Sequence, residues 1–109
     1  MAYVAAHNIF SPLGATSAAT FAAVAAGRSA VAAHAGLLDY AEPVWAARLP
    51  AGWARALPGI VGDFSPFELL LIASIRDAAS QAAVALTSPR TVFVFATTKG
   101  NIGLLDEAT

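Results

Sequence analysis

The chain has 109 residues, of which 58% are apolar and only 12% are charged, against a usual charged share of ~25%. Its net charge of −1 leaves no basic patch for phosphates, so nucleic acid is not an expected partner. It contains no cysteine, and no apolar run approaches the ~20 residues that cross a bilayer. Residues 1–109 are long enough for one small domain and too short for two, and we expect a cytoplasmic chain without a membrane span. Its low charge predicts apolar surface that needs a partner or a missing covering layer.

The first third of the chain predicts a strand followed by a helix. Residues 3–6 are typical of a short strand, and Ser11-Pro12-Leu13-Gly14 predicts a turn after it. Thr16 or Ser17 can cap a helix that Gly27 ends in a left-handed conformation. Because this helix has no charged residue, we expect it to be enclosed by other parts of the protein.

The middle of the chain, residues 32–63, predicts a long connection without regular structure. Prolines and glycines interrupt it repeatedly, and it holds both tryptophans, Trp45 and Trp53. A connection of this length is unusual in a small domain and tends to be functional or to cover another surface. The two large aromatic rings predict that it packs against the rest of the chain.

A second helix is predicted from Pro66 to about Leu86. Ser65-Pro66-Phe67-Glu68 is a capping box with proline at the first helical position. Apolar residues then recur every three or four positions, which predicts one inward face. The residues expected to face inward are Leu69, Ile72, Ile75 and Leu86.

The last predicted strand, residues 91–95, is apolar on both faces, which is typical of a central parallel strand covered on both sides. We expect it to share a sheet with residues 3–6. A polar turn at the carboxyl end of such a strand is where open α/β sheets bind ligands; the alternative is an ordinary solvated loop. The candidate pocket residues are Thr97, Thr98, Lys99, Gly100 and Asn101.

No other residues form a convincing site. His7 and His34 do not have metal-ligand spacing, so no metal or cofactor is expected, and His7 is interpreted as a structural, hydrogen-bonded residue. The serines lack the surroundings of a nucleophile elbow, and the acidic residues form no close pair. We expect no catalytic residue in this chain.

The ordered set of motifs resembles the N-terminal portion of a β-ketoacyl-acyl-carrier-protein synthase of the thiolase-like condensing enzymes. Residues 11–14 match the family's [ST]-P-x-G, and Gly27-Arg28-Ser29-Ala30 match its G-x-S-[GA]. The later helix and strand follow in the family's order. His7-Asn8 replaces the family's glycine-rich strand end, and residues 97–101 resemble synthases of aryl-polyene or flexirubin-type pigment pathways.

This resemblance implies an incomplete thiolase-like α/β fold with the order strand, helix, long connection, helix, strand. It implies a complete protein that condenses an acyl thioester with malonyl-carrier protein, with loss of carbon dioxide, in fatty-acid or polyketide-like biosynthesis. The nucleophilic cysteine and the basic residues of the family lie downstream of these residues, so the chain alone is expected to be inactive. The implied partners are acyl carrier protein, acyl and malonyl thioesters, and a second synthase subunit in a homodimer or heterodimer.

Two other functions stay open at this point. A non-catalytic subunit resembling a chain-length factor shares the fold but lacks the cysteine. An unrelated small α/β binding domain is the third reading, and the low charge argues against it because an isolated monomer of this composition is expected to behave poorly.

Overall fold

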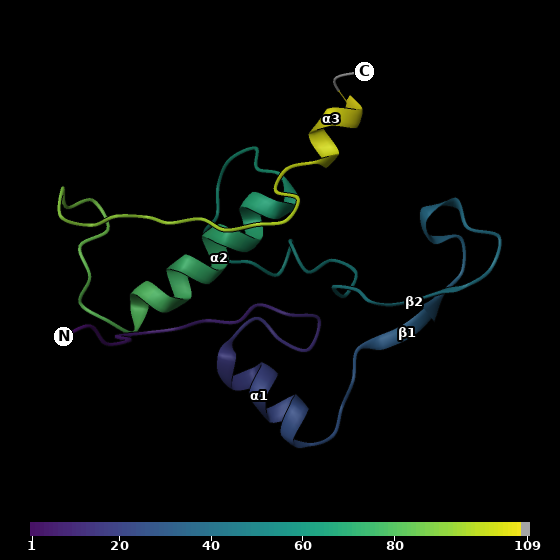
Figure 1. The fold of residues 1–109 in the computed structure, drawn as a ribbon, viewed down its shortest axis with the longest axis horizontal. Coiled ribbons are helices and arrows are strands. Elements are labelled where there is room, and N and C mark those ends of the chain that lie inside the picture. Colours follow the sequence, from purple (N-terminus) through teal and green to yellow (C-terminus); the bar gives the residue numbers. More distant parts are fainter. Residues whose placement is uncertain (108–109) are drawn as a thin grey trace.

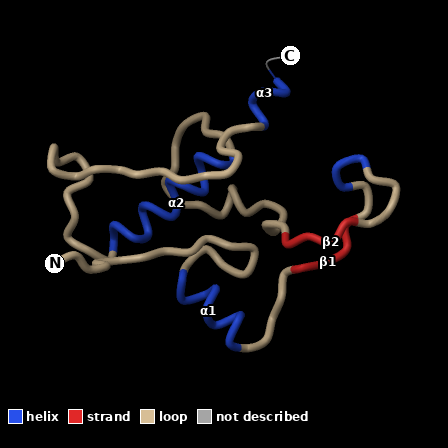
Figure 2. The backbone as a smooth tube through the Cα atoms, viewed as in Figure 1, coloured by secondary structure: helices blue, strands red, loops and turns tan. Residues whose placement is uncertain are grey.

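A computed structural model describes residues 1–107 and has a mixed α/β content, with three α-helices and one two-stranded antiparallel sheet in the described part (Figures 1 and 2). The coarse prediction of an α/β chain is therefore confirmed. The elements in chain order are α1 (Ser17–Ala25), β1 (Val31–His34), the 3₁₀ turn η1 (Leu37–Asp39), β2 (Val44–Ala47), α2 (Pro66–Ser80) and α3 (Gly103–Glu107).

Helix α1 begins and ends where the sequence predicts. The Thr16 side chain accepts a hydrogen bond from the backbone N–H of Ala19 at 3.1 Å, and Gly27 follows the helix with a φ of 73°. The prediction that the helix is enclosed is wrong. Ala23 is buried, but Phe21 is 74% exposed, because nothing in the described chain packs over that side of the helix.

The predicted structureless connection, residues 32–63, contains most of a β-hairpin, so that prediction is wrong over residues 32–47. β1 pairs with β2 in antiparallel register, and Leu38 and Asp39 take positive φ angles of 57° and 59° in the intervening loop. Alanine occupies half of the strand positions, so the sequence does not show the alternation of apolar and polar residues that would have identified the two strands. The hairpin extends away from α2 in Figure 1.

Helix α2 has the predicted capping box but ends earlier than predicted. Ser65 Oγ accepts from the N–H of Glu68 at 3.2 Å, and the N–H of Ser65 donates to Glu68 Oε1 at 3.4 Å. The helix ends at Ser80, not near Leu86, because Gln81 caps it and residues after it form tight turns. Of the residues predicted to face inward, Leu69, Ile72 and Ile75 are half-buried, and Leu86 is exposed.

The two predicted strands at residues 3–6 and 91–95 form no ladder, so the prediction that they share a sheet is wrong for the described chain. Both segments nevertheless run along α2. Residues 3–6 line one shallow hollow on this helix, and residues 93–95 line another beside Asn8. A lone pair of strands is a weak unit, and within residues 1–107 no other strand pairs with these two segments to extend it.

The chain buries unusually little of itself. Ala23 is the one fully buried side chain among the described residues. The radius of gyration is 16.6 Å, against about 13 Å for a compact domain of this length. The accessible surface is 8646 Å², against about 5,650 Å² for a compact protein of this mass. About 3,000 Å² of surface is therefore exposed that a compact domain would cover.

Candidate functional site

The polar turn at residues 97–101 is held together from within. Thr97 Oγ1 accepts hydrogen bonds from the backbone N–H groups of Lys99 at 3.3 Å and Gly100 at 2.9 Å. This is the hydroxyl-based turn that threonine favours. Gly100 has a φ of 54°, in the left-handed region that costs a residue with a side chain more than it costs glycine.

The same turn is joined to the beginning of α2. Ser65 Oγ, which caps the helix, also donates a hydrogen bond to Asn101 Oδ1. One hydroxyl therefore serves both the helix and the turn, although 36 residues separate the two partners in sequence. The conformation of the turn is in this way tied to the position of α2.

A cavity of about 390 Å³, here called the turn hollow, lies between these two elements. Gly100 and Asn101 line it, whereas Thr98 and Lys99 lie on the exposed part of the turn. The complete lining is Ser65, Pro66, Phe67, Gly100, Asn101, Gly103 and Leu104. Two of the five predicted pocket residues thus line one cavity, and Thr97 stabilises the turn through its hydrogen bonds to the backbone.

The groups that line the turn hollow suit binding rather than catalysis. Its polar groups are a hydroxyl and a carboxamide, and its lining holds no carboxylate, histidine or lysine. The Ser65 hydroxyl already bonds Asn101 and the helix, and the neighbouring Glu68 carboxylate accepts from the Ser65 backbone N–H rather than from the hydroxyl. Such a cavity suits an uncharged, partly apolar group.

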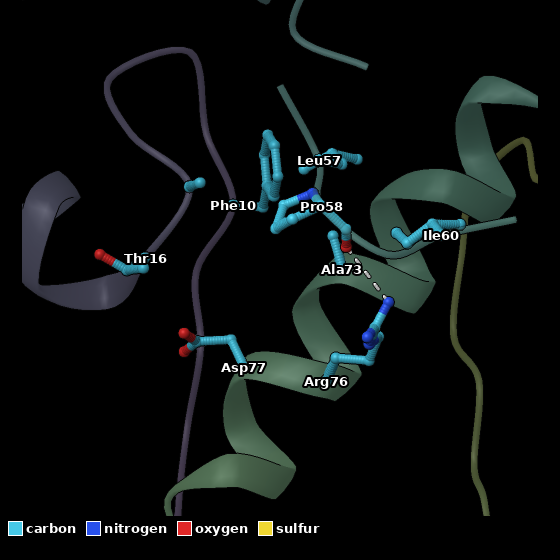
Figure 3. A pocket seen from close by; sticks show the side chains of 9 residues that line it. Phe10, Thr16, Leu57, Pro58, Ile60, Ala73, Arg76 and Asp77 are labelled. Carbon is cyan, nitrogen blue, oxygen red and sulfur yellow. Dashed lines mark hydrogen bonds between the residues drawn. The ribbon is translucent and has the colours of Figure 1, made fainter. Parts of the chain in front are cut away.

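A second cavity of about 270 Å³, which the sequence did not indicate, lies between α2 and residues 57–60 (Figure 3). Phe10, Leu57 and Pro58 form an apolar side, and Arg76 and Asp77 come from α2. Arg76 Nη1 donates to the Pro58 carbonyl at 3.4 Å. Nothing in the sequence spacing of these two charged residues marks a cavity.

Both histidines are hydrogen-bonded. His7 Nδ1 lies 2.9 Å from Ser17 Oγ at the start of α1, and His34 Nε2 lies 3.1 Å from the Ala46 carbonyl in the hairpin. The His7–Ser17 pair has the spacing of a base and a nucleophile. It has no carboxylate partner within the described residues to orient the ring, and His7 is exposed. The pair therefore holds the first segment against α1.

Asn8 is a residue that sequence reasoning missed. Its Nδ2 donates to Ser74 Oγ at 2.7 Å and to the Ala15 carbonyl at 3.2 Å, while its Oδ1 is buried with no hydrogen-bond partner among the described residues. A buried acceptor left unpaired costs about 1–3 kcal/mol. Asn8 lines the same hollow as residues 93–95, whose backbone belongs to no strand ladder in the described chain. The sequence feature that could have drawn attention to Asn8 is that His7-Asn8 stands where the resembling family has a glycine-rich strand end.

Within residues 1–107, no three histidine, cysteine or acidic side chains lie close enough together to hold a metal ion. None of the helices described is both long and apolar enough to span a membrane. Comparison with family models, curated proteins and solved structures finds no match to this chain.

Proposed function

We propose that this chain is the N-terminal part of a β-ketoacyl-acyl-carrier-protein synthase with a thiolase-like fold. The observation that carries the proposal is the uncovered surface of about 3,000 Å². One exposed stretch of apolar strand-like sequence is residues 92–95, where Val92 and Val94 are more than four-fifths exposed. Such a segment is stable in water only when further strands or helices cover it.

The turn that resembles the family's [ST]-P-x-G motif supports the proposal through its geometry. Ser11 and Gly14 exchange two backbone hydrogen bonds, of 2.8 and 3.1 Å, and so close a tight loop in front of α1. A Cβ atom on Gly14 would lie 2.6 Å from the Cβ of Ala19, closer than two carbon atoms can approach. Glycine is therefore required where the motif has it.

In the proposed enzyme this chain helps to bind and position the acyl thioester, and the remainder of the domain supplies the catalytic residues. A cysteine thiolate of the remainder takes an acyl group from a carrier thioester, and malonyl-carrier protein then loses carbon dioxide and attacks that acyl group. The turn hollow, with Gly100 and Asn101, forms a wall of the acyl or thioester pocket. Its lack of charge suits an acyl chain, and its lack of a base fits a wall better than a catalytic group.

The test is a condensation assay on the complete gene product with acyl-carrier and malonyl-carrier thioesters. The proposal predicts a β-ketoacyl product, release of one carbon dioxide for each condensation, and a cysteine that becomes acylated when malonyl thioester is left out. Replacing that cysteine with serine is the control and should abolish condensation. A complete product without such a cysteine, or one that is folded and neither acylated nor able to condense, contradicts the proposal.

A further inference from the structure

The cavity between α2 and residues 57–60, here called the Arg76 pocket, combines an apolar wall with two side chains of opposite charge (Figure 3). It is formed by segments far apart in the sequence. Phe10 comes from the first segment, Leu57 and Pro58 from the connection before α2, and Ala73, Arg76 and Asp77 from α2 itself. Its volume of about 270 Å³ is slightly below the range of about 300–1,000 Å³ found for drug-sized ligands. A ligand of this pocket is therefore small, with one ring or a short alkyl chain.

Arg76 is held at the pocket, but its charge is not paired there. Its Nη1 donates to the Pro58 carbonyl at 3.4 Å, which is the one hydrogen bond of this guanidinium within residues 1–107. The chain passes so close at Gly59, where φ is 69°, that a Cβ atom there would lie 3.2 Å from Nη2 of Arg76. A guanidinium carries five N–H donors in a planar fork that matches a carboxylate. Most of that fork has no partner in the described chain, so Arg76 is able to bind a carboxylate.

Asp77 is already part of a hydrogen-bonded chain. Gln81 Nε2 donates to Asp77 Oδ2 at 2.7 Å and to the His7 carbonyl at 3.2 Å, so the carboxylate helps to join the end of α2 to the first segment. Asp77 does not pair with Arg76, because neighbouring residues of a helix point in different directions. In Figure 3 the two side chains point to different sides of the pocket. Arg76 is therefore the charged group that is left for a ligand, and that ligand is an anion.

We propose that the Arg76 pocket binds a small apolar monocarboxylate, such as an arylalkanoate. The carboxylate lies on Arg76, which donates charge-assisted hydrogen bonds to it, and the apolar body lies against Phe10, Leu57 and Pro58. The negative charge of Asp77 disfavours a second anionic group on the ligand, and so disfavours phosphate and dicarboxylates. The Arg76 pocket shares no lining residue with the turn hollow, and the inference does not depend on the proposed enzymatic function.

The test uses the complete gene product with 3-phenylpropionate as the probe, and measures binding by ligand-observed NMR titration. We expect saturable binding with a dissociation constant of about 1 mM or lower, which is typical of a ligand of this size. The neutral amide of the same shape, 3-phenylpropionamide, and the cation 3-phenylpropylamine should each bind at least about tenfold more weakly. Binding that does not saturate, or a carboxylate that is less than about tenfold tighter than the amide or the amine, overturns the proposal.

A matched pair of arginine substitutions in the complete gene product locates the site. Arg76→Gln removes the charge from the pocket and should raise the dissociation constant of 3-phenylpropionate at least about tenfold. Arg48→Gln removes the same charge next to β2, outside the pocket, and should change it less than about threefold. Ala73→Leu fills the pocket without a change of charge and should also weaken binding at least about tenfold, even if Arg76→Gln disturbs the fold, as judged by circular dichroism. Equal effects of the two arginine substitutions, or parental binding by the Ala73→Leu variant, refute the assignment.

Discussion

Replacing Ser65 with alanine is expected to destabilise the chain through two hydrogen bonds made by one hydroxyl. Ser65 Oγ accepts from the N–H of Glu68 at 3.2 Å and donates to Asn101 Oδ1. Losing an N-cap side chain costs about 1 kcal/mol. Losing the bond to Asn101 adds about 1 kcal/mol. We therefore expect Ser65→Ala to lower the free energy of unfolding by about 2 kcal/mol.

Two further variants separate the contributions. Thr16→Ala removes only the cap of α1 and should cost about 1 kcal/mol. Asn101→Ala removes only the bond between the turn and α2, and should also cost about 1 kcal/mol. In the Ser65→Ala/Asn101→Ala double variant the shared bond is lost once, so the total should be about 2 kcal/mol rather than about 3 kcal/mol.

Urea unfolding followed by circular dichroism measures these differences, because the signal reports on the helices directly. The reasoning fails if Ser65→Ala costs no more than Thr16→Ala. It fails equally if the effects of Ser65→Ala and Asn101→Ala add to within about 0.5 kcal/mol, since additivity means that the two residues are not coupled.

Four other predictions follow from the same geometry. Gly100→Val should destabilise the chain by about 1–2 kcal/mol and Gly100→Asn by less than half of that, in the same urea assay, because φ is 54° there and asparagine tolerates this region. Ile72→Ala should cost about 1–2 kcal/mol, below the 2–5 kcal/mol range of fully buried sites, since Ile72 is only half-buried; a larger loss would contradict the structure. The urea m-value should be about 70% of that of a compact domain of this mass, because unfolding exposes about 7,500 Å² instead of about 10,400 Å². The 109-residue chain alone should neither condense nor accept acyl groups from thioesters, and mass spectrometry that finds an acylated Ser17 would overturn the structural reading of the His7–Ser17 pair.

The beginnings of α1 and α2 could be predicted from the sequence because local chemistry decides them, whereas α3 (Gly103–Glu107) was not predicted. The side chains of Ser65 and Glu68 each accept a hydrogen bond from the other residue's backbone N–H, and the Thr16 side chain accepts one from the N–H of Ala19. These bonds join residues three positions apart and do not depend on distant parts of the chain. The end of α2 could not be predicted in the same way. The apolar spacing continues to Leu86, but the side chain of Gln81 bonds the carbonyl of His7, a partner 74 residues away.

The strands were harder to predict because their existence depends on partners. Residues 91–95 have high strand propensity, but no strand of the described chain pairs with them. The alanine-rich segments β1 and β2 have lower propensity, yet they pair because the loop between them reverses the chain direction. The prediction that Trp53 packs is confirmed, since its ring meets Phe10 edge-on with centroids 5.8 Å apart. The same prediction for Trp45 is wrong, because that ring is exposed.

The turn at residues 97–101 could be predicted as a candidate site, but its cavity could not. Gly100 and a cluster of polar side chains mark a turn in the sequence. The cavity arises because Asn101 meets Ser65, and no sequence pattern links residues so far apart.

Hydrogen exchange of residues 3–8 and 91–96 tests most directly whether the rest of a ketosynthase domain completes this chain. In the 109-residue chain these backbone amides form no ladder, so all of them except that of Thr91, which donates to the Ser88 carbonyl at 3.0 Å, should exchange at nearly the rate of an unfolded peptide. In the complete gene product both segments should be slowed by at least about a thousandfold, which corresponds to an opening free energy of about 4 kcal/mol. Fast exchange of both segments in a folded, complete product would contradict the proposal that they are strands of a larger sheet.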